Sequence, residues 1–144
     1  LLRRYFDRPA ITTDLICGFP GETEAEFDAT LSFIEKCGFA AMHIFPYSIR
    51  PGTKAAAMEQ VPSAVKERRA GRAAQAAETM RQAYLQGCVG RVYPVLFEQE
   101  KDGYYTGHAP NYCEVGVRAN DLHNKVLDVK ITGIIGEMLV GELT

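Results

Sequence analysis

The sequence lacks the features that would place this chain in a membrane or outside the cell. No apolar run approaches the roughly 20 residues that a helix needs to span a bilayer. The N-terminus, LLRRYFDRPA, has neither an initiator methionine nor a signal-peptide pattern, and it reads like the end of a helix. We therefore expect a fragment of a longer cytoplasmic protein that has no membrane partner.

Closely spaced cysteines are also lacking. Cys17, Cys37, Cys88 and Cys113 stand far apart, and no CxxC or CxxxCxxC segment occurs. Zinc and iron–sulfur sites are commonly built on such local spacings, so we expect no metal ligand among these residues. Because no secretion signal accompanies the cysteines, we predict reduced, buried thiols instead of a disulfide framework.

No part of the chain has the strong basic excess that by itself indicates a nucleic-acid-binding protein. Residues 1–61 carry 6 basic and 8 acidic groups, residues 62–86 carry 5 and 2, and residues 87–144 carry 5 and 8. Any RNA-binding surface in the last segment would therefore be a local basic patch. The basic residues of the middle segment are expected on a solvated helix face that could extend such a patch: Lys66, Arg68, Arg69, Arg72 and Arg81.

The first half of the chain has the pattern of a β–α–β unit. Residues 11–18 are short, β-branched and mostly apolar, which is typical of a strand covered on both faces. Thr23 and Glu26 fit a capping box at a helix start, and Gly38 stands where a C-cap glycine belongs. Residues 39–47 predict a second strand, parallel to the first.

The second half predicts one long helix and then a small β-barrel. Residues 63–86 are rich in alanine and strong helix formers. The expected buried face of this helix comprises Val65, Ala73, Ala76, Met80 and Ala83. After Gly87, turn residues separate five strand-like runs: RVYPVLFEQ, GYYTGHA, NYCEVGV, VLDVKITGI and EMLVGEL. Five short antiparallel strands indicate a barrel of OB-like size, so we place a domain boundary between residues 86 and 87.

The stretch TTDLICGFPGETEAEF is the main candidate for a ligand-binding loop. In parallel α/β sheets, ligands bind at the carboxyl ends of strands, where residues 18–22 and 47–50 emerge. Gly18 would let a ligand approach the backbone, and the following helix N-terminus favours an anionic group. Alternatively, the glycines and the proline only turn the chain. Glu22 would either accept a hydrogen bond from a ligand ammonium or complement the helix N-terminus.

Other polar residues have both structural and functional interpretations. Asp14 lies within an apolar strand, where we favour a structural partner over a ligand role. His43 has no His or Cys neighbour in sequence and is expected in the core or facing a loop, not on a metal. In the last segment, aromatic residues could stack on bases or merely cover the barrel. They are Tyr104, Tyr105, His108 and Tyr112, and the candidate phosphate contacts are Arg91, Arg118, Lys125 and Lys130.

Several segments in fixed order resemble the radical S-adenosylmethionine methylthiotransferases along essentially the whole chain. They are TTDLICGFPGETEAEF, GFAAMHIFPYSIRPGTKAA, VPSAVKERR, GRVYPVLFE and GHAPNYCEV. The resemblance implies a flavodoxin-like domain, a radical-SAM partial TIM barrel and a TRAM barrel that binds tRNA. On this basis, residues 1–86 are the last βα units of the partial barrel with a connecting helix. Residues 87–144 are the five-stranded, OB-like TRAM β-barrel, so the fold class is α/β plus all-β.

The resemblance also implies a reaction. The family uses S-adenosylmethionine and two 4Fe-4S clusters to add a methylthio group to an unreactive carbon. The cluster cysteines are absent from these residues, so we expect the fragment itself to be inactive and to bind no cofactor. The segments HIFPYSIRPGTKAA and GHAPNY most resemble the branch acting on threonylcarbamoyladenosine beside the tRNA anticodon, and the isopentenyladenosine branch is close. The alternatives are a stand-alone RNA-binding module and the relative that modifies a ribosomal-protein aspartate.

Residue by residue, the resemblance implies two binding sites and no catalytic residue within this chain. The residues that match the S-adenosylmethionine site are Ile16, Gly18, Glu22, Phe45, Pro46 and Tyr47. The residues expected to face tRNA are Arg50, Arg91, His108, Tyr112 and Lys130. A partial barrel with so few strands would leave a strand edge unpaired, and we therefore expect a dimer through that edge or poor order in residues 1–60.

Overall fold

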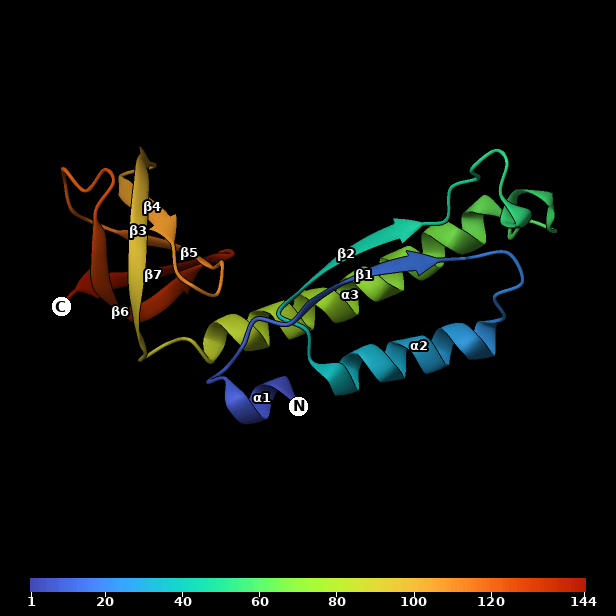
Figure 1. The fold of residues 1–144 in the computed structure, drawn as a ribbon, viewed down its shortest axis with the longest axis horizontal. Coiled ribbons are helices and arrows are strands. Elements are labelled where there is room, and N and C mark those ends of the chain that lie inside the picture. The colour runs from blue at the N-terminus through green and yellow to red at the C-terminus, as the bar shows by residue number, and fades with distance from the viewer. The chain divides into compact units, whose positions relative to one another are not determined.

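The structure is a computed structural model that describes residues 1–144 and contains two compact units (Figure 1). One unit comprises residues 11–81, and the other joins residues 1–10 to residues 82–144. The long helix α3 (Ser63–Gln86) contributes to both, because its last residues belong to the second unit. That the first unit is part of a radical-SAM domain and the second a TRAM domain stays a prediction.

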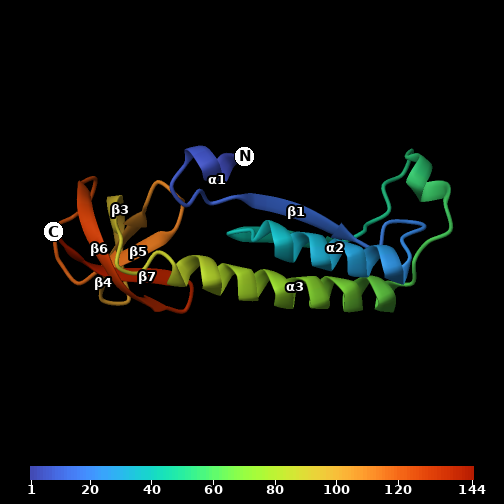
Figure 2. The same cartoon turned by 90° about the horizontal axis from the view of Figure 1, so that it is seen from below.

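Residues 11–81 form a β–α–β motif against which helix α3 packs. Strands β1 (Thr12–Cys17) and β2 (Ala41–Pro46) pair in parallel, as predicted, and α2 (Glu24–Cys37) connects them. Helices α2 and α3 lie on the same face of this two-stranded sheet (Figures 1 and 2). The core between the layers comprises Cys17, Phe27 and Ala73, with Leu15, Leu31, Ile44 and Ala70 packed against them.

Local sequence signals determine where α2 begins and ends. The Thr23 side chain accepts a hydrogen bond from the Glu26 backbone N–H, and the Glu26 carboxylate accepts one from the Thr23 N–H. These two bonds satisfy amide groups that have no partner within the helix. Gly38 takes the left-handed conformation with φ 59°. The predicted capping box and C-cap are confirmed, and so is the extent of α3.

The prediction that β1 is covered on both faces is wrong for this chain. Thr12, Asp14 and Ile16 form one exposed row, because both helices pack on the opposite face. His43 lies on the same open face of β2, where its ring stacks on Phe45 at a centroid distance of 6.5 Å; it is not a core residue. Each strand of the sheet has a neighbour on one side only. Nothing in the structure supports the expected dimer.

The buried face of α3 also differs in part from the prediction. Ala73 is buried and Met80 is partly buried, but Ala83 is exposed and Tyr84 is buried in its place. Arg69, expected on a solvated face, is only 4% exposed. Residues four apart in a helix lie one above the other, so Arg69 shares the buried stripe of Ala73. Between β2 and α3, the loop contains the short 3-10 helix η1 (Lys54–Ala57).

The second unit contains the short helix α1 (Leu2–Tyr5), the end of α3 and a closed five-stranded barrel. The predicted strands and the barrel are confirmed. The strands are β3 (Val92–Lys101), β4 (Tyr104–His108), β5 (Glu114–Val117), β6 (Val126–Ile135) and β7 (Met138–Leu143). They close in the order β3-β4-β5-β7-β6. Residues on alternate positions fill the interior, including Val95, Phe97, Val129, Ile131 and Leu139.

The prediction that all five strands are antiparallel needs a correction. Strands β5 and β7 pair in parallel, with Val115 opposite Leu139. A ring with an odd number of strands cannot alternate in direction all the way round, so closure requires at least one parallel pair. None of the helices in the structure is both long and apolar enough to cross a membrane.

Candidate functional site

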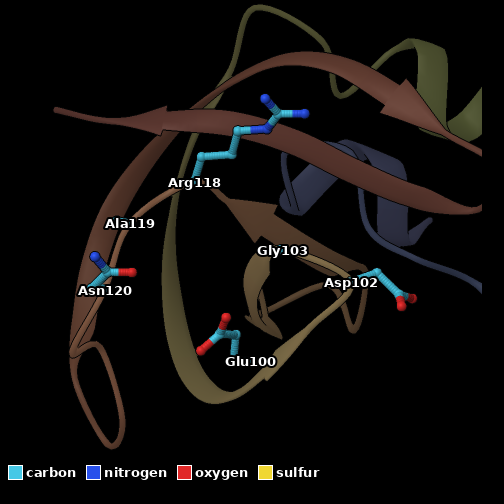
Figure 3. Close-up of a pocket in the computed structure, with 6 residues that line it drawn as sticks. All are labelled: Glu100, Asp102, Gly103, Arg118, Ala119 and Asn120. Atoms are coloured by element: carbon cyan, nitrogen blue, oxygen red, sulfur yellow. The ribbon is translucent and has the colours of Figure 1, made fainter.

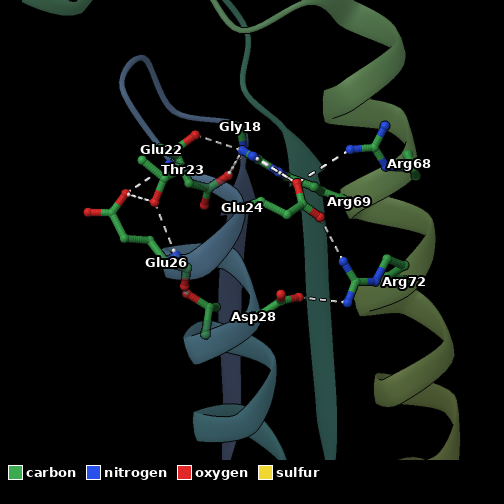
Figure 4. Close-up of polar contacts among 10 residues, drawn as sticks. Gly18, Glu22, Thr23, Glu24, Glu26, Asp28, Arg68, Arg69 and Arg72 are labelled. Atoms are coloured by element: carbon green, nitrogen blue, oxygen red, sulfur yellow. Dashed lines mark hydrogen bonds and ion pairs between the residues drawn. The ribbon is translucent and has the colours of Figure 1, made fainter.

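The turn after β1 is held together by a buried ion pair (Figure 4). Gly18, with φ +74°, donates its backbone N–H to Oε2 of Glu22 over 2.7 Å. Nη1 of Arg69 lies 2.6 Å from the same oxygen and also donates to the Glu22 carbonyl. The carboxylate of Glu22 is therefore bound within the protein, by a helix far away in the sequence.

Arg69 also binds the beginning of α2. Its Nη2 lies 3.1 Å from Oε2 of Glu24, and the more exposed Arg68 and Arg72 contact the same carboxylate (Figure 4). Burial lowers the pKa of Arg69, but hydrogen bonds to Glu24 and Glu22 outweigh this effect and raise it. The carboxylates near the helix start also complement the partial positive charge of its N-terminus.

The buried Cys17 lies at the end of β1, beside this network. Burial, and then the charge of Glu22, raise the pKa of the Cys17 thiol to about 11. Cys17 therefore stays protonated at neutral pH and has the properties of a small apolar core residue.

A second group forms where β2 ends. The Tyr47 carbonyl accepts a hydrogen bond from Nζ of Lys66 over 3.0 Å, and this ammonium also lies 5.8 Å from the centre of the Tyr47 ring. A Cβ atom on Gly18 would collide with the Lys66 stem. A pocket of about 470 Å³ opens here, lined by Pro46, Tyr47, Ser48, Ile49, Ser63, Lys66 and Glu67. The absence of a side chain at Gly18 thus makes room for a lysine that is part of this pocket.

The remaining residues of the predicted cofactor site lie on the open face of the sheet. Ile16 and Phe45 are direct neighbours across β1 and β2, and their exposed fractions are 53% and 51%. Pro46 follows at the exposed strand end. The structure thus joins Ile16 and Phe45 into one apolar surface next to the pocket residues Pro46 and Tyr47. Glu22 and Gly18 instead make the internal contacts described above.

The predicted tRNA-facing residues are divided between the two units, with Arg50 in residues 11–81 and the other four in the second unit. Arg50 is exposed in the β2–α3 loop, and its carbonyl accepts a hydrogen bond from the Thr53 hydroxyl. Arg91 pairs with Asp7, which raises the Arg91 pKa, and it lies beside the β3–β6 pairing that includes Lys130. His108 lies 2.7 Å from Glu98, and Tyr112 is 88% exposed in the β4–β5 connection.

The barrel carries a different pocket, with a volume of about 410 Å³ (Figure 3). Its lining residues are Glu100, Asp102, Gly103, Arg118, Ala119 and Asn120. The Arg118 guanidinium lies 5.2 Å from the centre of the Tyr104 ring, which is a cation–π distance. This arrangement combines a flat cation on an aromatic ring with carboxylate and amide groups. The sequence had indicated Tyr104 and Arg118 separately, but no pattern joined them to Asn120.

No family model matches the chain. It is 37% identical over 139 residues to the tRNA-2-methylthio-N(6)-dimethylallyladenosine synthase of Orientia tsutsugamushi strain Boryong, covering 92% of this chain and 31% of that protein. It is also 37% identical over 129 residues to the threonylcarbamoyladenosine tRNA methylthiotransferase MtaB of Bacillus subtilis strain 168, covering 85% of this chain and 29% of that protein. The chain therefore spans less than a third of the length of these relatives.

Proposed function

The chain belongs to the tRNA methylthiotransferase family, and from this premise we propose that it is the C-terminal part of such an enzyme. The complete enzyme would add a methylthio group to a hypermodified adenosine beside the anticodon, with threonylcarbamoyladenosine as the substrate. The observation that carries the proposal is the similarity along 92% of the chain, which includes both units. It confirms the expected family, and we expect the protein to work in the cytoplasm.

The choice of substrate rests on two short segments. HIFPYSIRPGTKAA and GHAPNY resemble the threonylcarbamoyladenosine branch, and MtaB of B. subtilis is among the relatives. The second candidate is dimethylallyladenosine, because the Orientia relatives at the same level of identity are named for that nucleoside. We favour the first because both segments resemble that branch; one includes pocket residues after β2, and the other spans the β4–β5 connection.

We propose that the open face of β1 and β2 contributes to an S-adenosylmethionine site. The exposed Ile16 and Phe45 fit this role, because an adenine ring packs well on adjacent apolar side chains and their strand ends lie at the ligand-binding edge. Pro46 and Tyr47 would border the adenine. The bound cofactor would supply the radical and methyl chemistry, while Glu22 and Gly18 would shape the turn. The ligands of the two clusters are proposed to lie outside these residues.

We propose that the barrel binds single-stranded tRNA at the pocket beside Arg118. Carboxylates repel phosphates, but Glu100 can accept hydrogen bonds from base amino groups, and Asn120 can both donate and accept. RNA loops are commonly read by stacking unpaired bases on aromatic rings or guanidinium planes and by contacts to the base edges. The pair of Arg118 and Tyr104 offers such a surface in a barrel whose net charge is negative.

The test is tRNA binding by the 144-residue chain across a salt series, with unmodified, threonylcarbamoyl-modified and isopentenyl-modified tRNA. We expect binding that weakens as salt rises and that prefers the threonylcarbamoyl form. The Arg118→Ala change should weaken binding about tenfold, which is roughly the effect of losing one stacked base. Lys36→Ala is the control, because Lys36 is an exposed cation in the last turn of α2 with no proposed contact to RNA.

The other outcomes identify the alternatives. Preference for isopentenyl-modified tRNA would select the dimethylallyladenosine branch. Binding without any preference would fit a stand-alone RNA-binding module. No binding to any tRNA would contradict tRNA binding by these residues and favour the relative that modifies a ribosomal protein.

A further inference from the structure

Two cysteines far apart in the sequence meet in the interior of the second unit. Cys88 follows the end of α3 and Cys113 immediately precedes β5, and both are 0% exposed. The Asn111 side chain bridges them, because its Nδ2 donates to the Cys88 sulfur over 3.8 Å and its Oδ1 accepts from the Cys113 backbone N–H over 3.2 Å. The Cys88 thiol donates a hydrogen bond to the Tyr84 backbone carbonyl over 3.4 Å. The two cysteines therefore belong to one set of hydrogen bonds around Asn111, and the pKa of Cys88 responds to a hydrogen bond with Cys113.

The surroundings of Cys88 favour its thiolate form. The hydrogen bond from Cys113 lowers the pKa of Cys88; burial opposes this effect, and hydrogen bonds from Tyr93 and Arg8 lower the pKa further. The Arg8 guanidinium is held in place because its Nη2 donates to the Tyr84 carbonyl over 2.7 Å. Its buried Nε has no hydrogen-bond partner. A fixed cation beside one of two adjacent thiols is the arrangement that activates a cysteine for disulfide exchange.

We propose that Cys88 and Cys113 form a redox-active dithiol that closes reversibly to a disulfide. The Cys88 thiolate attacks a small-molecule disulfide, for which glutathione disulfide is the probe, and one glutathione thiolate leaves and is protonated. Cys113 then loses its proton and attacks the Cys88 sulfur, so that the protein S–S bond forms and the second glutathione leaves. Two electrons and two protons pass from the protein thiols to the small-molecule disulfide.

The turn that covers Cys113 provides a route for the oxidant. It is a short segment in which the Tyr112 N–H bonds to the Ala109 carbonyl and the Ala109 N–H bonds to the Cys113 carbonyl. Tyr112 is 88% exposed with φ +58°, a conformation that is unfavourable for a residue other than glycine. Opening this turn breaks these bonds and the Asn111 contacts but no strand pairing, so it costs less than opening the barrel.

The other two cysteines serve as internal controls. Cys17 belongs to the unit of residues 11–81 and stays protonated, and Cys37 is half-buried at the end of α2. At Cys17, burial and the Glu22 charge outweigh the opposing effect of Arg69, so this thiol is not activated. Oxidation should therefore select one pair among the four thiols.

The experiment equilibrates the 144-residue chain in glutathione buffers of increasing oxidised fraction, then traps free thiols by alkylation and maps tryptic peptides by mass. We expect QAYLQGCVGR and DGYYTGHAPNYCEVGVR to appear as a linked pair lighter by two hydrogens, with Cys17 and Cys37 alkylated. Reduction should restore four alkylated cysteines. The proposal fails if all four remain alkylated in every buffer, or if the links formed involve Cys37.

Two variants test the order of the steps. Cys113→Ser should trap Cys88 as a glutathione mixed disulfide and abolish the linked pair, whereas Cys37→Ser should leave the pair unchanged. Arg8→Gln should slow the oxidation about fivefold, because a smaller thiolate fraction attacks more slowly. A Cys113→Ser protein that never acquires glutathione would contradict the role of Cys88 as the attacking thiol. The wild-type peptide map decides the proposal even if a variant does not fold.

Discussion

Nη1 of Arg69 lies 2.6 Å from Oε2 of Glu22, and Gly18 donates its N–H to the same oxygen. Arg69 is on α3, whereas Gly18 and Glu22 lie in the turn after β1. The conformation of this turn therefore depends on a side chain that arrives from a later helix. In the proposed enzyme, that turn borders the cofactor side of the sheet.

Removal of Arg69 is expected to destabilise the chain strongly. The side chains of Arg69 and Glu22 are 4% and 15% exposed, so Arg69→Ala would leave a carboxylate buried without its cation. Breaking such a pair costs about 3–5 kcal/mol. Urea unfolding measures the loss, and Arg68→Ala is the control, because its 56% exposed side chain should contribute less than about 1 kcal/mol. Equal losses for the two variants would contradict a special role for Arg69.

Gly18→Ala is expected to cost more stability than Gly52→Ala. Both glycines have positive φ, +74° and +84°, so both substitutions strain the backbone by about 1–2 kcal/mol. Nothing lies within 4 Å of the new Cβ at Gly52, whereas at Gly18 it meets the Lys66 stem. The difference in unfolding free energy between the two variants measures this contact. It would be zero if Lys66 could move away without loss.

The barrel should be sensitive to Gly107→Ala and tolerant of Gly133→Ala. A Cβ at Gly107 would overlap the Leu96 carbonyl, and backbone cannot move without opening the β3–β4 pairing. Overpacking of this kind costs about 1–3 kcal/mol or more. At Gly133 the nearest atom is Val140 Cγ2 at 3.5 Å, an ordinary contact. Thermal unfolding followed by circular dichroism distinguishes the two, and similar melting temperatures would show that the barrel relaxes around residue 107.

The capping box makes part of the stability depend on pH. The backbone hydrogen bond from Thr23, followed by the one from its side chain, lowers the Glu26 pKa below its ordinary value of 4.5. A depressed carboxyl pKa contributes stability that is fully present above the ordinary value and is lost as pH falls through the folded-state pKa. Wild type should therefore be more stable than Glu26→Gln at pH 6, and the difference should shrink in acid. Urea unfolding from pH 6 to pH 2.5 checks this, and a constant difference would refute it.

Local signals made much of the fold predictable. Thr23, Glu26 and Gly38 bound α2 because helix ends need partners for their free N–H and C=O groups, which neighbouring residues supply. Turns rich in glycine and polar residues likewise marked the ends of the five barrel strands. The parallel pairing of β5 with β7 was missed, because it depends on the order of the strands around the ring, which local signals do not encode.

The sequence by itself determined the extent of the helices and strands, the presence of a barrel and the family, since these depend on local periodicity, capping and ordered motifs. Only the tertiary structure decided which residues meet. Lys66 fills the space beside Gly18, Arg69 binds Glu22, Arg118 covers Tyr104, and Asn111 bridges Cys88 and Cys113. Each of these contacts except the last two joins segments that are more than forty residues apart. Such contacts follow from packing and burial, which act through space and leave no periodic pattern along the chain.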